Sequence, residues 1–137
     1  MSRFVDSNIW IYAYVASGDA ARHQRARSAV EGLLDLYISD QVVTEVAANL
    51  LRKAHLSESD ILLRIEDLAA RCIIVRLDMT IHRRAGRLRA ADQRAFSYWD
   101  SLIVAAALES GCSELWSEDL QAGRVIEGRL TIVNPLI

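Results

Sequence analysis

The stretch FVDSNIWIYAY, residues 4–14, joins a short apolar segment to a longer one through a single acidic residue, Asp6. Residues 3–5 predict a brief buried strand, and residues 8–16 predict a helix that Gly18 closes. A strand that passes directly into a helix is the first half of a crossover connection between parallel strands. This segment therefore predicts a parallel α/β fold in which Asp6 lies at the carboxyl end of the first strand.

The rest of the chain repeats this alternation of short and long apolar patterns. Further strands are predicted at residues 37–39, 72–76, 114–117 and 130–133. Helices are predicted at residues 19–36, 41–55, 78–91 and 99–109, with another beginning at Ser57. Asp40 is expected to cap helix 41–55, and Ser57 with Asp60 forms a capping-box pattern. We predict a three-layer α/β/α sandwich with a mostly parallel, five-stranded sheet, in which helix 99–109 is the most buried helix.

Length and composition limit the classes of protein to which the chain can belong. Its 137 residues fit one domain, residues 1–137, and 52% apolar residues with 25% charged residues suit a globular core. The net charge of −2 argues against a protein that holds nucleic acid by bulk charge alone. The longest apolar run, residues 102–108, is too short to span a bilayer. We expect no membrane association.

The cysteines and the start of the chain suggest a reducing compartment. Cys72 and Cys112 are far apart and form no CxxC pair, so we expect reduced thiols rather than a disulfide or a zinc site. The opening MSRFVDSN has no basic region followed by an apolar stretch of the kind that directs export. We therefore expect a cytoplasmic protein.

Four acidic residues are expected to meet at one edge of the sheet. Asp6 follows the first strand, and Asp119 lies two residues beyond the end of the fourth. Asp100 opens the apolar helix 99–109, and Glu45 lies one turn into helix 41–55. Ligands of open parallel sheets bind beyond the carboxyl ends of the strands, where all four residues can converge. Taken alone, each of them has an ordinary explanation as a helix cap, a turn residue or a solvated helix residue.

A cluster of four carboxylates has a chemical consequence. Like charges at close range raise each other's pKa, so the four cannot all remain ionised without a cation. Ligand sets made only of oxygen select hard ions, Mg²⁺ or Mn²⁺, over zinc. Such a site is suited to the attack of water on a phosphodiester.

Four segments, in order along the chain, resemble the motifs of the PIN-domain family. They are FVDSNIWIYAY, VVTEVAANLLRK, YWDSLIVAAALESGC and LWSEDLQAG, which contain Asp6, Glu45, Asp100 and Asp119 in turn. The resemblance extends from Phe4 to Pro135 and is closest to the VapC toxins of type II toxin–antitoxin systems.

The resemblance implies an activity, a cofactor and partners. Such proteins are Mg²⁺- or Mn²⁺-dependent endoribonucleases, commonly homodimers, that a small antitoxin protein inhibits. It implies that Asp6, Glu45, Asp100 and Asp119 are the catalytic and metal-binding residues, with Asn8 and Ser117 supporting them through hydrogen bonds. Glu118, next to Asp119, leaves open whether it shares the role of Asp119.

Two alternatives to a nuclease deserve comparison. The first is a PIN-like module that binds RNA or protein without cleaving, but such a module has no need of four mutually repelling carboxylates. The second is a phosphate-acceptor α/β domain of the receiver or haloacid-dehalogenase type. A receiver requires an acidic pair after the first strand and a late lysine, and a dehalogenase-type phosphatase requires DxD. Here Ser7 and Asn8 follow Asp6, and Lys53 lies inside a helix.

Arginines and aromatic residues outside the four motifs have two possible roles each. Arg83, Arg84 and Arg87 on helix 78–91 are candidates for contact with RNA or the antitoxin, and a solvated face is the alternative. Trp10, Trp99 and Trp116 all lie in apolar segments. For these tryptophans we expect packing in the core or at an interface rather than stacking on bases.

Overall fold

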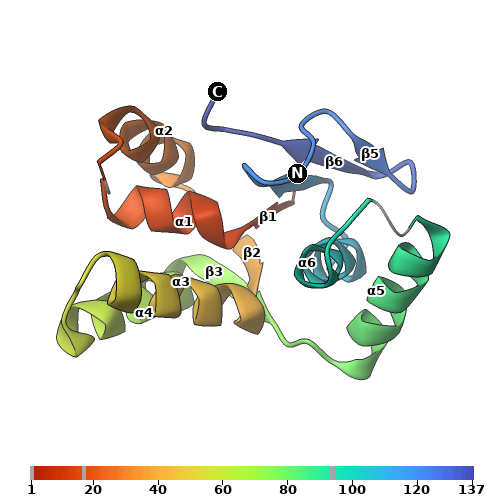
Figure 1. The fold of residues 1–137 in the computed structure, drawn as a ribbon, viewed down its shortest axis with the longest axis horizontal. Coiled ribbons are helices and arrows are strands. Elements are labelled where there is room, and N and C mark those ends of the chain that lie inside the picture. The colour runs from red at the N-terminus through yellow and green to blue at the C-terminus, as the bar shows by residue number, and fades with distance from the viewer. Residues whose placement is uncertain (1, 17, 93–94) are drawn as a thin grey trace.

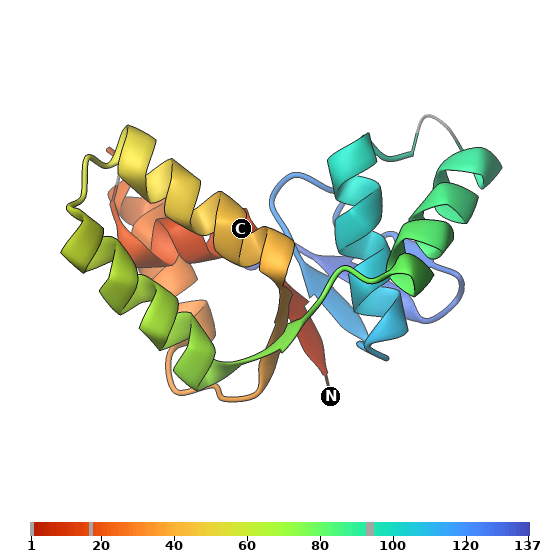
Figure 2. The same ribbon diagram turned by 90° about the horizontal axis from the view of Figure 1, so that it is seen from below.

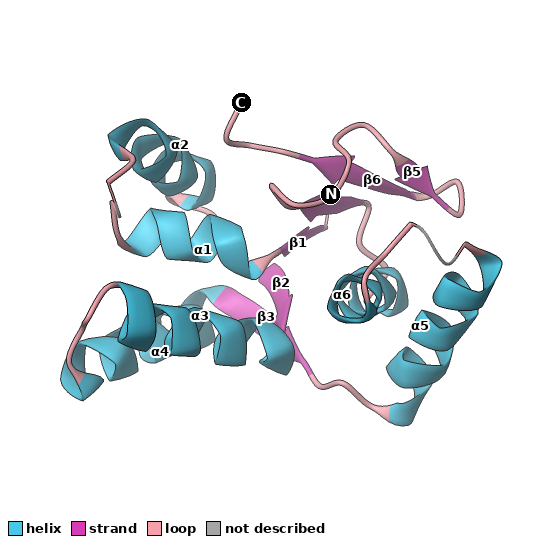
Figure 3. Ribbon diagram, in the orientation of Figure 1, coloured by secondary structure: helices cyan, strands magenta, loops and turns pink. Residues whose placement is uncertain are grey.

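The computed structural model describes residues 2–16, 18–92 and 95–137 of the chain (Figure 3). Within these residues, strands form one sheet with the order β3-β2-β1-β4-β6-β5. The strands are β1 (Arg3–Val5), β2 (Leu36–Ser39), β3 (Cys72–Val75), β4 (Glu114–Trp116), β5 (Val125–Ile126) and β6 (Leu130–Val133). The helices are α1 (Ser7–Tyr14), α2 (Ala20–Val30), α3 (Asp40–Lys53), α4 (Glu58–Arg71), α5 (Met79–Ala91) and α6 (Tyr98–Glu109).

The sheet is mostly parallel, which confirms the fold class predicted from the alternation of strands and helices. Strand β1 is central and pairs in parallel with β2 on one side and β4 on the other. Strands β3 and β6 extend the parallel sheet outward on the two sides. All five parallel strands therefore end at the same edge, where the segments that follow β1 and β4 lie next to each other.

The sheet contains one strand more than the five that we predicted. The additional strand, β5, is antiparallel to β6 at the end of the sheet. It is two residues long, too short to show an alternating pattern in the sequence. The β5–β6 connection turns through Glu127 and Gly128, both with positive φ, and Arg129 N donates to Ile126 O over 3.1 Å. Positive φ at both central residues is the geometry of a type I′ hairpin turn.

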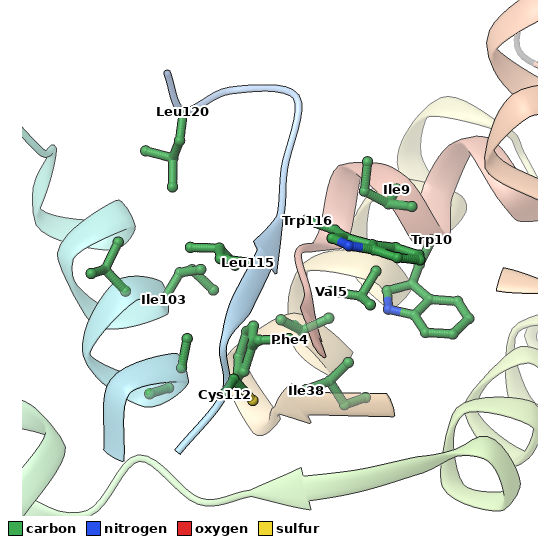
Figure 4. Packing of buried hydrophobic residues seen from close by; sticks show 14 of the residues in the cluster. Phe4, Val5, Ile9, Trp10, Ile38, Ile103, Cys112, Leu115, Trp116 and Leu120 are labelled. Carbon is green, nitrogen blue, oxygen red and sulfur yellow. The ribbon is translucent and has the colours of Figure 1, made fainter. Parts of the chain in front are cut away.

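Helices cover both faces of the sheet (Figures 1 and 2). The helices α1 to α4 lie on one side, and α5 and α6 lie on the other. Strand β4 shows how the layers meet, since Leu115 points toward Ile103 of α6 while Trp116 points toward Ile9 and Trp10 of α1 (Figure 4). This alternation follows from the two-residue period of a strand.

Helix α6 is the most deeply buried helix, as predicted. Residues 101 to 108 are all buried, and the side chains among them are apolar apart from Ser101. Among the described residues, no helix has the length and apolar character that crossing a membrane requires.

Several helix boundaries differ from the sequence prediction. Helix α1 ends at Tyr14, where Val15 is extended, rather than at residue 16 before Gly18. Helix α2 ends at Val30 instead of continuing to residue 36, because Gly32 and Asp35 adopt left-handed backbone conformations that a helix cannot contain. Ser39, rather than Asp40, caps α3 by accepting a hydrogen bond from Val42 N over 3.4 Å. Asp40 lies in the first turn of that helix. Of the predicted capping box one half is formed, because Ser57 Oγ accepts from Asp60 N over 3.2 Å, while Asp60 Oδ2 accepts from the Ser57 hydroxyl over 2.9 Å rather than from the Ser57 backbone.

Candidate functional site

Asp6 is held at the carboxyl edge of the sheet by both of its neighbours in the fold. Its backbone N donates to Trp116 O over 2.9 Å, which fixes the end of β1 against the end of β4. Its side chain caps α1, with Oδ1 accepting from Ser7 N over 2.7 Å. The residue is only 4% exposed. Asp6 is therefore both a helix cap and a buried carboxylate at the edge where ligands of such sheets bind.

Ser117 connects Asp6 to the segment that contains Asp119. Its hydroxyl is fully buried and donates to Asp6 Oδ2 over 2.9 Å. The same Oγ accepts from Asp119 N over 3.2 Å. This one side chain orients the Asp6 carboxylate and shapes the turn that presents Asp119, which is itself exposed.

Glu45 and Asp100 approach this edge from opposite sides of the sheet. Glu45 lies on α3 and is partly buried, and Asp100 lies in the first turn of α6. Ser97 begins α6 by accepting from Asp100 N over 3.1 Å. The structure thus brings the starts of α1, α3 and α6 to the edge at which β1 and β4 end.

The pKa values of three of the four carboxylates are raised, first by burial and further by the charges of the other acids. Burial raises the pKa of Asp6 to about 7; hydrogen bonds from Ser117 and from the Ser7 backbone oppose this, and the charges of Glu45 and Asp119 reinforce it. Burial also raises the pKa of Glu45, and the charges of Asp100 and Asp119 add to the effect. Burial raises the pKa of Asp100 in the same direction, again with Asp119 contributing. The charge of Asp119 raises the pKa of each of the other three acids, so it is linked electrostatically to all of them.

The donor set of this edge fits a hard divalent cation, although the side chains do not form a closed cage. All four acids offer oxygen. Glu45 Oε1 is buried and has no hydrogen-bond partner within the described part of the chain, so one acceptor of the cluster is unsatisfied. No group of three or more acidic, histidine or cysteine side chains among the described residues has a geometry that would itself hold a metal ion. Uptake of a cation would therefore have to draw the carboxylates inward.

Glu118 and Asp119 are adjacent in sequence but lie in different surroundings. Glu118 Oε2 accepts from Arg22 Nε over 2.8 Å, so its charge is paired with an arginine of α2. Its backbone N donates to Asn8 Oδ1 over 3.4 Å, which places Asn8 as a support for this loop. The charge of the Asp119 carboxylate, by contrast, raises the pKa values of Asp6 and Asp100.

The three arginines singled out on α5 also differ from one another. Arg84 is only 19% exposed in its side chain and forms ion pairs with Glu109, over 2.9 Å, and with Glu127, over 2.6 Å. Arg83 and Arg87 are exposed. Arg84 is thus engaged within the fold, and only Arg83 and Arg87 offer their charges to a partner.

Trp99 does not lie in the core, which leaves packing at an interface as the untested part of our expectation for this residue. Trp10 and Trp116 are buried, whereas Trp99 is 64% exposed. It lies one residue before Asp100, in the first turn of α6, before that helix enters the core. The sequence pattern misled because the apolar run of α6 begins only after this turn.

Several supporting residues were missed by the sequence interpretation. The Ser7 hydroxyl and Gln41 both lower the pKa of Glu45, against the effect of burial. Gln41 is buried, and its Nε2 donates to Trp99 O over 3.3 Å, which joins α3 to α6. Ser97 could have been identified, because SYWD at 97–100 has the spacing of a helix-capping motif. Nothing in the sequence pattern distinguishes Ser7 or Gln41 from other polar helix residues.

A groove of about 830 Å³ adjoins Glu45, one of the four acids. It lies between α3 and the start of α6, and Glu45 and Trp99 both line it. A hollow of about 530 Å³ lies away from the acids, beside Tyr14 and Arg71.

Comparison with known proteins identifies one family and a set of similar structures. The model of the PIN domain matches residues 3–127. Mycobacterium tuberculosis VapC20, described as a toxin that cleaves the sarcin–ricin loop, is 22% identical with a TM-score of 0.71, covering 93% of this chain and 99% of its own. A toxin–antitoxin complex from Klebsiella pneumoniae is 21% identical with a TM-score of 0.69, covering 98% of each chain. VapBC2 from Rickettsia felis, bound to a DNA fragment from its promoter, is 17% identical with a TM-score of 0.68 over 98% of each chain. No curated protein matches the chain in sequence.

Proposed function

The chain belongs to the PIN-domain family, and on that basis we propose that it is a divalent-metal-dependent endoribonuclease, the toxin of a toxin–antitoxin pair. The reaction is the hydrolysis of RNA phosphodiester bonds with water as the nucleophile. One observation carries the proposal: acids from distant parts of the sequence meet at the carboxyl edge of the sheet, where burial and the charge of Asp119 both raise the pKa values of Asp6, Glu45 and Asp100. Such a cluster does not favour the stability of the fold, because like charges at close range raise the free energy of one another.

Asp6, Glu45, Asp100 and Asp119 would hold Mg²⁺ or Mn²⁺. The unsatisfied Glu45 Oε1 and the raised pKa values of three of these acids are what a cation would relieve. When bound, the ion supplies the positive charge that lowers the pKa of water and stabilises negative charge on the phosphate.

The protein's own side chains orient this cluster and control its protons. The Ser117 hydroxyl donates to Asp6 Oδ2, so the Asp6 carboxylate keeps one orientation through the reaction. Without a cation Asp6 holds its proton up to about pH 7, and a cation must displace that proton. Ser97 fixes the first turn of α6 and with it the position of Asp100. Asn8 holds the loop after β4 through the Glu118 backbone.

The partners of this protein follow from the same proposal. The similar structures from Klebsiella pneumoniae and Rickettsia felis are described as toxin–antitoxin assemblies. We extend that association to this chain, with RNA as substrate, a small antitoxin protein as inhibitor and a second copy of the chain as partner in a homodimer. The exposed arginines Arg83 and Arg87 are available for RNA phosphates or for acidic residues of the antitoxin.

The direct test is cleavage of total cellular RNA by the purified protein. Cutting should require Mg²⁺ or Mn²⁺ and stop in EDTA, and expression of the protein should arrest growth. Asp100→Ala should abolish both effects while leaving the circular dichroism spectrum unchanged. Full activity in the Asp100→Ala protein, or equal cutting in EDTA, would exclude the proposed mechanism.

A further inference from the structure

Trp99 is a largely exposed aromatic side chain that lies beside Asp100 in the sequence. The side chain is 64% exposed, and it lines the groove between α3 and α6. Tyr98 packs edge-to-face with the Trp99 ring, with centroids 5.3 Å apart, and this contact restricts the movement of Trp99. Tyr98 is in turn covered by Arg89, whose guanidinium carbon lies 4.6 Å from the ring centroid. The fold therefore holds a large apolar surface in water next to Asp100.

One face of α3 forms the opposite wall of this groove. Gln41, Glu45, Asn49 and Arg52 recur at spacings of three and four residues and all line the groove. Glu45 belongs to both features, so the groove is continuous with the acidic site. Asp40 also lines the groove, but its Oδ1 accepts from the backbone N of Gln41 and of Leu77.

Two polar groups of this wall are without partners. Gln41 is 8% exposed, and its Oε1 is buried with no hydrogen-bond partner among the described residues. Arg52 is exposed, and within the described residues its side chain forms no ion pair or hydrogen bond. Arg52 lies seven residues beyond Glu45, which is about 10 Å along the helix axis. From Glu45 toward Arg52 the groove is lined by Asn49, whose Nδ2 donates to Glu45 O over 2.8 Å, and then by the positive charge of Arg52.

We propose that this groove binds an unpaired nucleotide of the RNA next to the bond that is cut, with Trp99 stacking on its base and Arg52 holding a neighbouring phosphate. The inference rests on the proposed nuclease function and adds the binding mode. Base–aromatic stacking accepts any base and requires a single-stranded segment, because a paired base keeps its faces inside the duplex. The continuity of the groove with the acids and the unpaired charge of Arg52 favour RNA over a partner protein. The site therefore selects unpaired RNA at the point of cleavage.

The first test measures binding of RNA under conditions in which the proposed cleavage cannot occur. Wild-type protein in EDTA is titrated with single-stranded 8-mers of A, C, G or U, following the intrinsic tryptophan fluorescence and the anisotropy of a labelled oligomer. Because Trp10 and Trp116 are buried, stacking should quench the fluorescence of Trp99. Trp99→Ala should weaken binding by about 5- to 150-fold, the range expected for one base stacked on one aromatic ring. Trp99→Phe should retain most of the affinity, and Leu62→Ala, which removes another exposed apolar side chain, should leave it unchanged.

Three results of this titration would overturn the inference. They are an absence of oligomer binding by the wild-type protein, wild-type affinity in Trp99→Ala, and a saturating oligomer that leaves the fluorescence unchanged. A change in sedimentation mass in Trp99→Ala, with RNA binding intact, would also overturn it, because it would place Trp99 in a protein interface.

Cleavage assays distinguish an error in the proposed role of the groove from an error in the proposed nuclease activity. If the protein cuts RNA, Trp99→Ala should raise KM far more than it lowers kcat, and an abasic nucleotide beside the cut should impair the wild type but not Trp99→Ala. If RNA is cut normally by Trp99→Ala, the groove assignment fails and the nuclease stands. If the oligomers bind and quench Trp99 but RNA is never cut, binding of single-stranded RNA in the groove stands, whereas the nuclease and the position beside a cut bond both fail.

Arg52 provides a second test with its neighbour as the matched control. Arg52→Ala should weaken binding of all four oligomers by a similar factor and reduce the slope of log affinity against log salt by about 1. Lys53→Ala removes the adjacent charge on the same helix but does not touch the groove, and it should have little effect. Equal effects of the two substitutions would reduce Arg52 to a contributor to bulk charge and contradict its assigned contact.

Discussion

The acidic edge of the sheet and the outer face of α5 both gather charged side chains, but they arrange them in opposite ways. On α5, Arg84 lies between Glu109 and Glu127, so opposite charges are paired, although its Nε is buried without a hydrogen-bond partner among the described residues. At the sheet edge, burial and the like charges of neighbouring acids together raise the pKa values of Asp6, Glu45 and Asp100. The first arrangement contributes to stability and the second costs it. Groups held at such a cost are candidates for a functional site, which is the role that we propose for the acidic edge.

The largest expected effect comes from removing one acid of the edge. Asp6→Asn and Asp100→Asn should each lower the rate of RNA cleavage at least about 1,000-fold, because charge stabilisation by a bound ion is worth several kcal/mol. The metal-free variants should unfold at the same or a higher temperature than the wild type, because one source of repulsion is gone. Cleavage rates and thermal melts in EDTA check both statements. A variant that melts much lower in EDTA would show that the acid serves the fold instead.

Adjacent acids of the loop after β4 give a sharper contrast. Asp119 acts on the other three acids, whereas Glu118 is paired with Arg22. Asp119→Ala should lower the apparent affinity for Mn²⁺ by about 10- to 100-fold, a typical cost of disturbing the groups around a metal. Glu118→Ala should change it by less than about threefold, within the range of an exposed ion pair. Calorimetric titration of both variants with Mn²⁺ measures the two affinities. A larger loss of affinity in Glu118→Ala than in Asp119→Ala would assign the metal-binding role to Glu118.

Proton binding at Asp6 makes the acidic edge sensitive to pH. The pKa of this carboxyl is about 7 in the folded protein and ordinarily 3.8, so the folded state holds a proton that the unfolded state has lost. The proton on Asp6 therefore makes its full contribution to the free energy of unfolding below about pH 4, and this contribution is lost as the pH rises toward 7. Without metal, the free energy of unfolding should fall across this interval, and Asp6→Asn should flatten the decline.

The same proton should compete with a metal ion. Apparent Mn²⁺ affinity of the wild type should fall by at most about tenfold per pH unit below 7, because one proton must leave Asp6. Titrations at pH 6, 7 and 8 measure this slope. A Mn²⁺ affinity that is constant over this pH range would show that Asp6 does not bind the ion.

The smallest effect is expected on α5. Arg84→Ala should lower the free energy of unfolding by about 1 kcal/mol, because two partly exposed ion pairs are lost. Arg83→Ala, one position earlier and exposed, should leave stability unchanged in urea denaturation. Equal stabilities of the two variants would mean that the α5 ion pairs contribute nothing to the fold.

The sequence predicts the features that depend on local order and periodicity. Asp6 at the end of β1, the buried course of α6 and the parallel sheet follow from apolar runs and the residues that punctuate them. The exposure of Trp99 and the ion pairs of Arg84 depend on which elements pack together, and periodicity carries no information on these contacts. The β5 strand is defined by its pairing with β6, because two residues have no pattern of their own. The separate surroundings of Glu118 and Asp119 arise from Arg22, nearly 100 positions away in the chain.

Direct measurement of Mn²⁺ uptake tests the common role of the four acids most sharply. Electron paramagnetic resonance of free Mn²⁺ at pH 8 should show binding by the wild type, and weaker binding by Asp6→Asn and by Asp100→Asn. Arg84→Ala, which alters only the ion pairs of α5, should bind as the wild type does. Failure of the wild type to take up Mn²⁺, or equal uptake by all four proteins, would contradict a shared cation site at this edge.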